Sequence, residues 1–577
     1  MSTTTGRLSR VAPMRRVSDA AWYAGSVVVG AILVVMAALQ QPFNENELKQ
    51  MAPYASGSLH QIIGETRQPP LDPLLGAMVQ HLLGEGQLRQ RLVPVLAGIG
   101  ALAVMGLLLR RLGVGVVGAF ALLVMATAPL FVRYSAYSRP YALPMFLMVI
   151  FVYAAQGWLD THARRWLVLA AVATLALLLA RVPEPVMFLL TTMVSLAWFA
   201  FRGRLSWSQV WPLIAIPAVG LMAVGYPTFR ALRSQTGGST LDSTLSRFTS
   251  RFDRSLHQLV TEFASLIASS FPWWPITLAV IVAAFAWPVS RRRLLGWWFL
   301  FPLLVPPTAW VLIYHFLSPY SLQTLPYRAR SALFFVPAYT VVVLALAAGV
   351  VETVHRADRR LRAGLAVVLA AALVTQLPAT GRVLVQDLSP DVGEAAAVLT
   401  RLPEDAIVLY DTPSPSGYWH QPFRARPRYL GDRPEVLQVS QLMRHPKSVP
   451  PQGPVYLLML DSECAYSTVC DEAPADWNGE VGGWRVVRRF DRYTLYEPRA
   501  PLSGRVGVLQ ALRDFAASLG PDLGSGETFG AAALLKLRGR SREGKSLINQ
   551  MYEDAEPGAE ERIRHNAERR NQDPFQH

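Results

Sequence analysis

Two glutamates follow the first long apolar stretch of the chain, and their chemistry suits proton transfer. Residues 22–39 carry no charge, and Glu45 and Glu47 come soon after them, where a membrane-spanning segment would meet water. A carboxylate at that depth is costly unless it has a partner or a task. It can act as a general base toward an acceptor hydroxyl or amine. The alternative, that both are solvated loop residues, stays open from the residues alone.

Two arginine-containing segments and a rigid turn come later in the chain. Arg67 begins the sequence RQPPL, a turn that would direct the chain back toward the membrane. Residues 133–141 (RYSAYSRPY) contain Tyr134, Arg139 and Tyr141 and no acid. Arginine binds phosphate through two parallel hydrogen bonds, so this segment predicts an anionic lipid headgroup as ligand.

A second pair of arginines supports the same interpretation. Arg328 and Arg330 precede the apolar run at 331–351. Boundary arginines also extend to lipid headgroups without any specific role, and that alternative stays open. What favours a site is the order along the chain of one acidic and two basic segments.

The sequence indicates no cofactor. No glycine-rich phosphate loop is present, and no histidine–cysteine cluster has metal-ligand spacing. A divalent metal is compatible with the carboxylates, but nothing in the sequence points to one. The histidines considered as ligands are scattered: His60, His81, His257 and His315.

The elements that must position these residues are membrane-spanning helices. The chain has 577 residues, of which 52% are hydrophobic and 16% charged, against about 25% charged in average soluble proteins. About eleven uncharged, mostly apolar runs are long enough to cross a bilayer as helices. They are residues 22–39, 92–109, 114–132, 140–157, 166–180, 185–201, 209–226, 272–290, 294–314, 331–351 and 363–377.

Basic residues set the predicted orientation. The net charge is +15, but the arginines lie at the edges of apolar runs, which indicates membrane topology and argues against a nucleic-acid partner. They cluster at every second boundary, so residues 1–21 are predicted to be cytoplasmic and everything after 378 external. We therefore expect a multi-pass protein of the cell membrane.

Three predicted external segments are long enough to carry a site. Two are loops, 40–91 and 227–271, and the third follows the transmembrane region of residues 22–378. In the second loop, residues 245–266 have helical periodicity and would lie in the membrane interface or pack on neighbouring spans. After 378, strands at 406–410, 455–460 and within 484–496 and a helix at 395–402 predict an α/β domain over 379–500. Residues 501–577 form a charged tail, expected to be partly disordered.

Both cysteines, Cys464 and Cys470, fall in this external region. A disulfide persists in such a compartment, so a short bridged loop is the favoured interpretation. Two free thiols are the alternative.

Taken in order, these motifs resemble those of the GT-C superfamily of membrane glycosyltransferases, in particular the protein O-mannosyltransferases and the aminoarabinose transferase of lipid A. Members of that family carry an acidic pair in the first external loop, where this chain has Asn46 and Glu47 with Glu45 beside them. The family's His-Pro-Pro-Leu-like turn corresponds to Arg67-Gln-Pro-Pro-Leu. Its Tyr-Ser-x-x-x-Arg-x-Tyr-Ala-Leu segment matches residues 134–143, and its later Arg-Tyr-Leu-like element corresponds weakly to Arg330-Ser-Ala.

The resemblance covers residues 20–350 and implies a reaction. A polyprenyl-phosphate-linked sugar would place its phosphate near Arg139 and Arg330, while Glu47 or Glu45 deprotonates an acceptor, with inversion at the anomeric carbon. The acceptor would be an extracytoplasmic glycan, lipid or protein, and membrane lipid is the other implied partner. Asn46 replaces the acid that the family presents as base, so a glutamate would have to take over.

Two other classes of function compete with the transferase. A lipid or glycan transporter is disfavoured because the predicted spans contain no ionisable coupling residue and show no inverted repeat. A non-catalytic scaffold for cell-envelope assembly stays open because of Asn46.

Overall fold

The computed structural model divides the chain into two compact units, which are described separately. One consists of Met1–Gln41 and Pro53–Gln386, the other of Pro42–Ala52 and Asp387–His577. Structure is described for residues 13–41, 47, 50, 51, 54, 62, 69–84, 86–112, 115–181, 183–235, 274–305, 333, 335–354, 370, 373–385, 397–403, 405–411, 435–438, 454–460, 480, 481, 484–490, 493–499 and 541–553.

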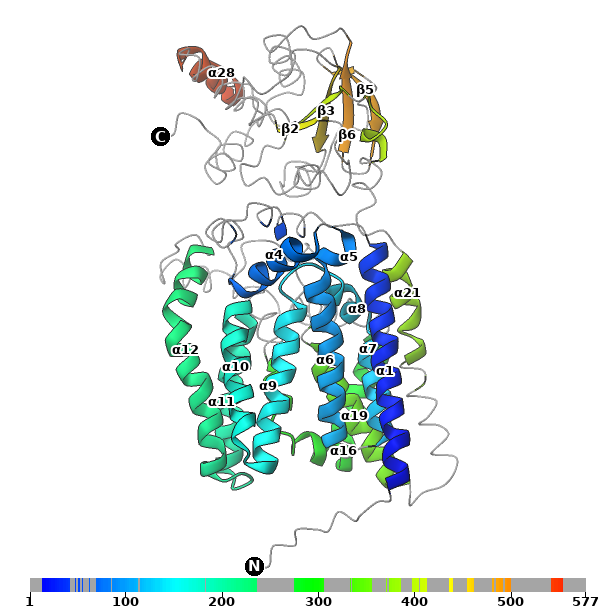
Figure 1. The fold of residues 1–577 in the computed structure, drawn as a ribbon, viewed down its shortest axis with the longest axis vertical. Coiled ribbons are helices and arrows are strands. Elements are labelled where there is room, and N and C mark those ends of the chain that lie inside the picture. The colour runs from blue at the N-terminus through cyan, green and yellow to red at the C-terminus, as the bar shows by residue number, and fades with distance from the viewer. Residues whose placement is uncertain are drawn as a thin grey trace, which may run out of the picture. The chain divides into compact units, whose positions relative to one another are not determined.

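The first unit is a bundle of helices that run side by side (Figure 1). Its described helices are α1 (Pro13–Gln40), α4 (Leu71–Leu83), α5 (Gln87–Gln90), α6 (Leu92–Arg111), α7 (Val116–Ala126), α8 (Pro129–Ser135), α9 (Ala142–Thr161), α10 (Arg164–Ala180), α11 (Pro183–Phe201), α12 (Trp207–Gln235), α15 (Trp274–Ala286), α16 (Pro288–Leu294), α19 (Phe335–Val354) and α21 (Leu377–Val385).

These helices make the chain a polytopic helical membrane protein. Among the described residues, 5 helices are long and apolar enough to cross a bilayer, or 6 if one bent pair counts as a span. Large apolar side chains such as Val28, Ile32 and Leu96 face outward from the bundle. Lipid is as apolar as these side chains, so a surface of this kind is stable in a bilayer and not in water.

Two predicted spans are interrupted rather than continuous, because a proline begins the second half of each. The run at 114–132 forms α7 and α8, whose axes differ by 63°. Pro129 stands at the start of α8, and Ala128 before it has the extended conformation (φ −65°, ψ 124°) that a following proline favours. The run at 272–290 breaks in the same way at Trp287, ahead of Pro288. Hydropathy alone does not reveal these breaks.

The polar groups freed at the first break are satisfied by another helix. Thr380 of α21 donates its hydroxyl to the carbonyl oxygen of Thr127 at 2.6 Å, in a buried position. Gln376 lies beside it, with its Oε1 3.5 Å from the Thr127 hydroxyl. α6 also packs closely on α8, since a Cβ on Gly98 of α6 would lie 2.5 Å from the hydroxyl of Ser135. The direction of α8 is therefore set by α6 and α21.

The predicted loop 40–91 contains a helix that periodicity did not reveal. On α4, Asp72 and Gln80 are buried, whereas Met78, Leu82 and Leu83 are exposed. This polarity is the reverse of that of a helix on a soluble protein and suits the membrane interface. The structure thus places polar groups of this helix toward the bundle.

Hydrogen bonds join the C-terminal end of α1 to residues 87–91, at the end of the predicted loop 40–91. The buried Arg91 donates to the carbonyl oxygens of Ala38, at 2.9 Å, and Gln41. Gln87 also donates to the carbonyl oxygen of Gln41, and the Gln41 side chain donates to Val383 of α21 at 2.6 Å. A cation at a helix C-terminus satisfies carbonyl groups that have no partner within the helix. Arg91 is therefore a structural boundary arginine.

The second unit contains a mixed six-stranded sheet. Its strands are β1 (Ile407–Asp411), β2 (Glu435–Gln438), β3 (Val455–Leu460), β4 (Glu480–Val481), β5 (Trp484–Arg489) and β6 (Tyr493–Pro498), in the order β2-β1-β3-β6-β5-β4. β1 pairs in parallel with β2 and β3, and β6 pairs antiparallel with β3 and β5. The predicted strands at 406–410, 455–460 and within 484–496 are found; β2 and β4 were not predicted.

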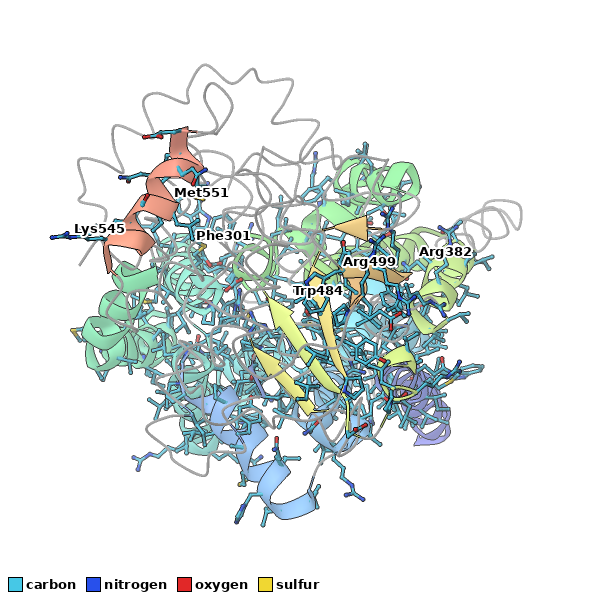
Figure 2. The ribbon with its side chains drawn as sticks, turned by 90° about the horizontal axis from the view of Figure 1, so that it is seen from above. Phe301, Arg382, Trp484, Arg499, Lys545 and Met551 are labelled. Carbon is cyan, nitrogen blue, oxygen red and sulfur yellow. The ribbon has the colours of Figure 1, made fainter. Side chains whose placement is uncertain are left out.

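Outside the sheet, the second unit has helical residues at 397–399, within the helix predicted at 395–402, and the helix α28 (Ser541–Glu553). Trp484 of β5 is fully buried, and on α28 Met551 is buried while Lys545 is exposed (Figure 2). Arg485 and Glu497 form an ion pair at 2.5 Å across β5 and β6. Burial raises the pKa of Tyr456, with Glu497 adding to the rise and Arg485 opposing it.

Candidate functional site

Three tyrosines gather where α8 turns into α9. The ring of Tyr134 meets those of Tyr137 and Tyr141 edge to face, with centroids 5.8 and 5.4 Å apart. The rings of Tyr137 and Tyr141 stack at 6.3 Å. Such contacts contribute about 0.5–1.5 kcal/mol each beyond the burial of the rings. The segment 133–141 is therefore an ordered cluster, held by its own aromatic side chains.

The arginines of this segment are half-buried beside the rings. The guanidinium carbon of Arg133 lies 5.7 Å from the centre of the Tyr134 ring. Its Nε is buried, and no described group accepts a hydrogen bond from that atom. Arg139 is likewise half-buried. Ser138 ties the segment to α5 by donating to the carbonyl oxygen of Gln90 at 3.0 Å.

An ion pair that the sequence analysis missed adjoins the tyrosines. Arg181, just after α10, donates from Nε to Oε2 of Glu184 at 2.6 Å and from Nη2 to Oε1 at 2.9 Å. Glu184 is fully buried in the first turn of α11. The same guanidinium lies 4.7 Å from the centre of the Tyr141 ring. Tyr141 is thus packed against a cation whose position a buried carboxylate fixes.

We call residues 87–91, 133–141 and 181–184 the tyrosine end of the bundle. They lie where α6, α9 and α11 begin and where α8 and α10 end, so they share one end of the helix bundle. The signal for the missed pair was present as RVPE, two charges at a boundary between apolar runs. The predicted span began at 185 and so excluded Glu184.

The other predicted site residues are distributed as follows. Tyr134, Arg139 and Tyr141 lie together in the tyrosine end. Glu47 is fully buried and belongs to the second unit. The remaining predictions lie outside the described residues, and they are Glu45, Arg67, Arg328, Arg330, Cys464 and Cys470.

The tyrosine end suits the binding of an anion. Besides the exposed Arg89 and the structural Arg91, Arg133, Arg139 and Arg181 bring three positive charges, and Glu184 brings one negative charge that Arg181 already engages. Guanidinium groups half-removed from water interact more strongly with phosphate than they do in bulk solvent. Tyrosine hydroxyls add neutral donors. Among the described residues, no group of histidine, cysteine, aspartate or glutamate side chains could hold a metal ion.

Comparison with known proteins gives a match in structure and none in sequence. No family model matches the chain, and no curated protein matches it by sequence. ArnT from Cupriavidus metallidurans bound to undecaprenyl phosphate is similar with a TM-score of 0.52 at 14% identity, over 84% of this chain and 99% of that chain. The apo form of ArnT gives 0.50 at 14% identity, over 83% and 98%.

An oligosaccharyltransferase from Archaeoglobus fulgidus, in complex with Zn and sulfate, gives a TM-score of 0.41 at 11% identity, over 76% of this chain and 68% of that chain. That value is too low to support an inference. The similarity to ArnT concerns the fold alone: this chain has a fold like that of ArnT.

Proposed function

We propose that this chain is a glycosyltransferase that moves a sugar from a polyprenyl-phosphate carrier to an acceptor outside the cytoplasm. The observation that carries the proposal is the tyrosine end, an arginine–tyrosine cluster within a chain that has the fold of ArnT. One of the ArnT structures is bound to undecaprenyl phosphate, which supports a polyprenyl phosphate as the carrier. The sugar is a hexose or a pentose, and the acceptor is a glycan, a lipid or a protein.

In this proposal, the donor phosphate binds at Arg133 and Arg139, with Arg181 held alongside by Glu184. Glu47, or Glu45, takes the proton of the acceptor hydroxyl. The acceptor oxygen then bonds to the anomeric carbon as the bond from that carbon to the phosphate oxygen breaks, with inversion. Polyprenyl phosphate leaves with the electron pair, and the guanidinium groups stabilise its charge. Arg67, Arg328 and Arg330 remain candidate donor contacts.

The topology that goes with this function is also a proposal. About eleven spans would place the N-terminus in the cytoplasm and residues 379–500 outside, as the arginine pattern predicts. The tyrosine end then faces the outer leaflet, where a lipid-linked donor would be used. A disulfide between Cys464 and Cys470 is compatible with that compartment.

Substitution of the two glutamates tests the reaction. We expect the isosteric changes Glu45→Gln and Glu47→Gln, made separately and together, to remove a sugar from envelope glycans while the protein stays folded in the membrane. Glu553→Gln is the matched control, since Glu553 is an exposed glutamate of α28. Unchanged glycans in the double variant would favour the scaffold, and cargo accumulating on one side of the membrane would favour a transporter.

A further inference from the structure

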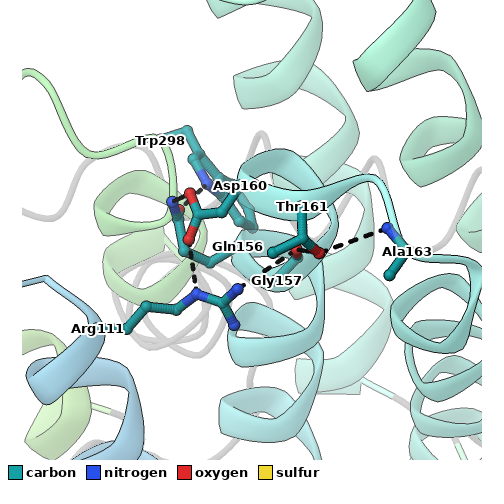
Figure 3. A network of polar contacts seen from close by, with 7 residues as sticks. All are labelled: Arg111, Gln156, Gly157, Asp160, Thr161, Ala163 and Trp298. Carbon is teal, nitrogen blue, oxygen red and sulfur yellow. Dashed lines mark hydrogen bonds and ion pairs between the residues drawn. The ribbon is translucent and has the colours of Figure 1, made fainter.

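The opposite end of the bundle has its own arginine cluster, and we call it the tryptophan end: Arg111 with residues 156–166, 198–211 and 288–298. At its centre, Nε of Arg111 donates to Asp160 at 2.6 Å (Figure 3). Gln156 donates to the other oxygen of Asp160 at 2.8 Å and accepts from the indole of Trp298 at 3.1 Å. Arg111 also lies over the ring of Trp166, at 4.9 Å. Both carboxylate oxygens of Asp160 are therefore engaged.

Hydrogen bonds join the turns of the tryptophan end into one surface. The indole of Trp158 donates to the carbonyl oxygen of Gln209 at 2.7 Å, and the Gln209 side chain meets His162 at 3.0 Å. Arg204 donates to the carbonyl oxygen of Leu295 at 2.6 Å. The turns before α10, before α12 and after α16 are thus connected.

This surface carries an excess of positive charge. Asp160 is the single acid within its described residues, and Arg111 already neutralises it. The exposed arginines of this surface lie at the start of α10, on the turn between α11 and α12, and on α16: Arg164, Arg165, Arg202, Arg204, Arg291 and Arg292. A field of this kind attracts anions.

Exposed aromatic side chains flank the arginines on the turn between α11 and α12. Trp198, Phe201, Trp207 and Trp211 are 52%, 76%, 53% and 62% exposed. The guanidinium of Arg202 stacks on Trp198 at 4.6 Å, and Trp198 stacks on Phe201 at 6.2 Å. Tryptophan at the ends of spanning helices lies at the boundary between headgroups and acyl chains. A ligand that matches both the arginines and the aromatic side chains has a phosphate group and a hydrocarbon body. A soluble polyanion has no hydrocarbon body.

We infer that the tryptophan end binds an anionic phospholipid of the leaflet opposite the tyrosine end, with its phosphate at Arg202 and Arg164 and its acyl chains along Trp198, Trp207 and Trp211. Basic sites between helix ends are known to hold such headgroups. The inference rests on this surface alone and stands whether or not the chain transfers sugars.

The test uses the full chain in nanodiscs that contain equal amounts of phosphatidylglycerol and phosphatidylcholine, followed by native mass spectrometry of the retained lipids. We expect wild type to retain phosphatidylglycerol preferentially. The R164Q/R202Q variant should lose preference on the order of thirty-fold. Arg204 is left unchanged because its bond to Leu295 supports the fold. R164K/R202K keeps the charge and should keep most of the preference.

A matched control removes two arginines from the other end. Arg89 and Arg382 are exposed at the ends of α5 and α21, and R89Q/R382Q should leave the preference unchanged. Equal loss in this control, an unchanged preference in R164Q/R202Q, or no preference in wild type would overturn the inference. Displacement of the retained lipid by inorganic phosphate alone would also overturn it, since the site would then recognise a free anion.

Discussion

The two ends of the helix bundle use the same side chains in opposite ways. At the tryptophan end, the acid and its arginine are partly exposed, and so are the four aromatic rings on and beside the turn between α11 and α12: Trp198, Phe201, Trp207 and Trp211. At the tyrosine end, the acid is fully buried and the rings pack on one another. In the two proposals above, the outward arrangement binds a lipid of the membrane surface, and the inward arrangement binds a phosphate that enters the protein. Arginines beside aromatic rings therefore do not identify a site until burial is known.

The largest expected effect concerns the buried acid of the tyrosine end. Glu184→Gln leaves the half-buried Arg181 without its counter-charge, and we expect the free energy of unfolding to fall by about 3–5 kcal/mol. Denaturant unfolding in detergent measures it. A loss as small as that of an exposed ion pair would show that the two ends do not differ in this respect.

The next effect is on activity. Arg139→Gln should lower the rate of sugar transfer roughly a hundred- to a thousand-fold, because a group that stabilises charge in the transition state is lost. Arg292→Gln, an exposed arginine of the tryptophan end, is the control and should leave the rate unchanged. Release of polyprenyl phosphate from a polyprenyl-phosphate sugar, followed over time, gives both rates. Similar rates for the two variants would remove Arg139 from the proposed site.

A smaller effect is expected where α21 supports the direction of α8. Thr380→Val removes the donor to the Thr127 carbonyl and should cost about 1–2 kcal/mol of stability. Thr174→Val is the control, because that buried hydroxyl bonds to Ala170 within its own helix. We also expect only the first variant to weaken transfer, since Tyr134 lies on α8. Equal effects in thermal unfolding and in transfer would contradict this role for Thr380.

The smallest effect belongs to the tryptophan end. Asp160→Asn should lower stability by about 1 kcal/mol or less, because the pair with Arg111 is partly exposed and water replaces it. The same denaturant measurement serves as for Glu184. A loss of several kcal/mol would show that the Arg111 network is as critical as the buried pair.

The sequence predicted the polytopic helical fold, whereas the site residues that it named stay predictions. Long apolar runs identify spans because lipid offers no hydrogen-bond partner to the backbone, and a helix satisfies the backbone groups within the span. The break before Pro129 was missed because hydropathy averages over it. That Tyr134, Arg139 and Tyr141 lie in one cluster could be predicted because their spacing is local, and their role in a site stays a prediction.

Other features depend on tertiary structure and gave a weaker signal. Arg181 and Glu184 were missed because a charge pair at a span boundary resembles an ordinary loop until its burial is known. The grouping of Glu47 with the second unit joins segments more than 300 residues apart in sequence, and no local pattern encodes that. Strand β2 is only 4 residues long, too short for an alternating pattern to stand out.

The bonds around Gln41 have a consequence for a chain that has been cut. Gln87 and Arg91 donate to the carbonyl oxygen of Gln41, just after α1, and the Gln41 side chain donates to Val383 of α21. If a protease cut the chain between residues 42 and 68, these hydrogen bonds would still hold the two fragments together at Gln41. A nicked molecule should migrate as one particle under native conditions and separate into two fragments only in denaturant.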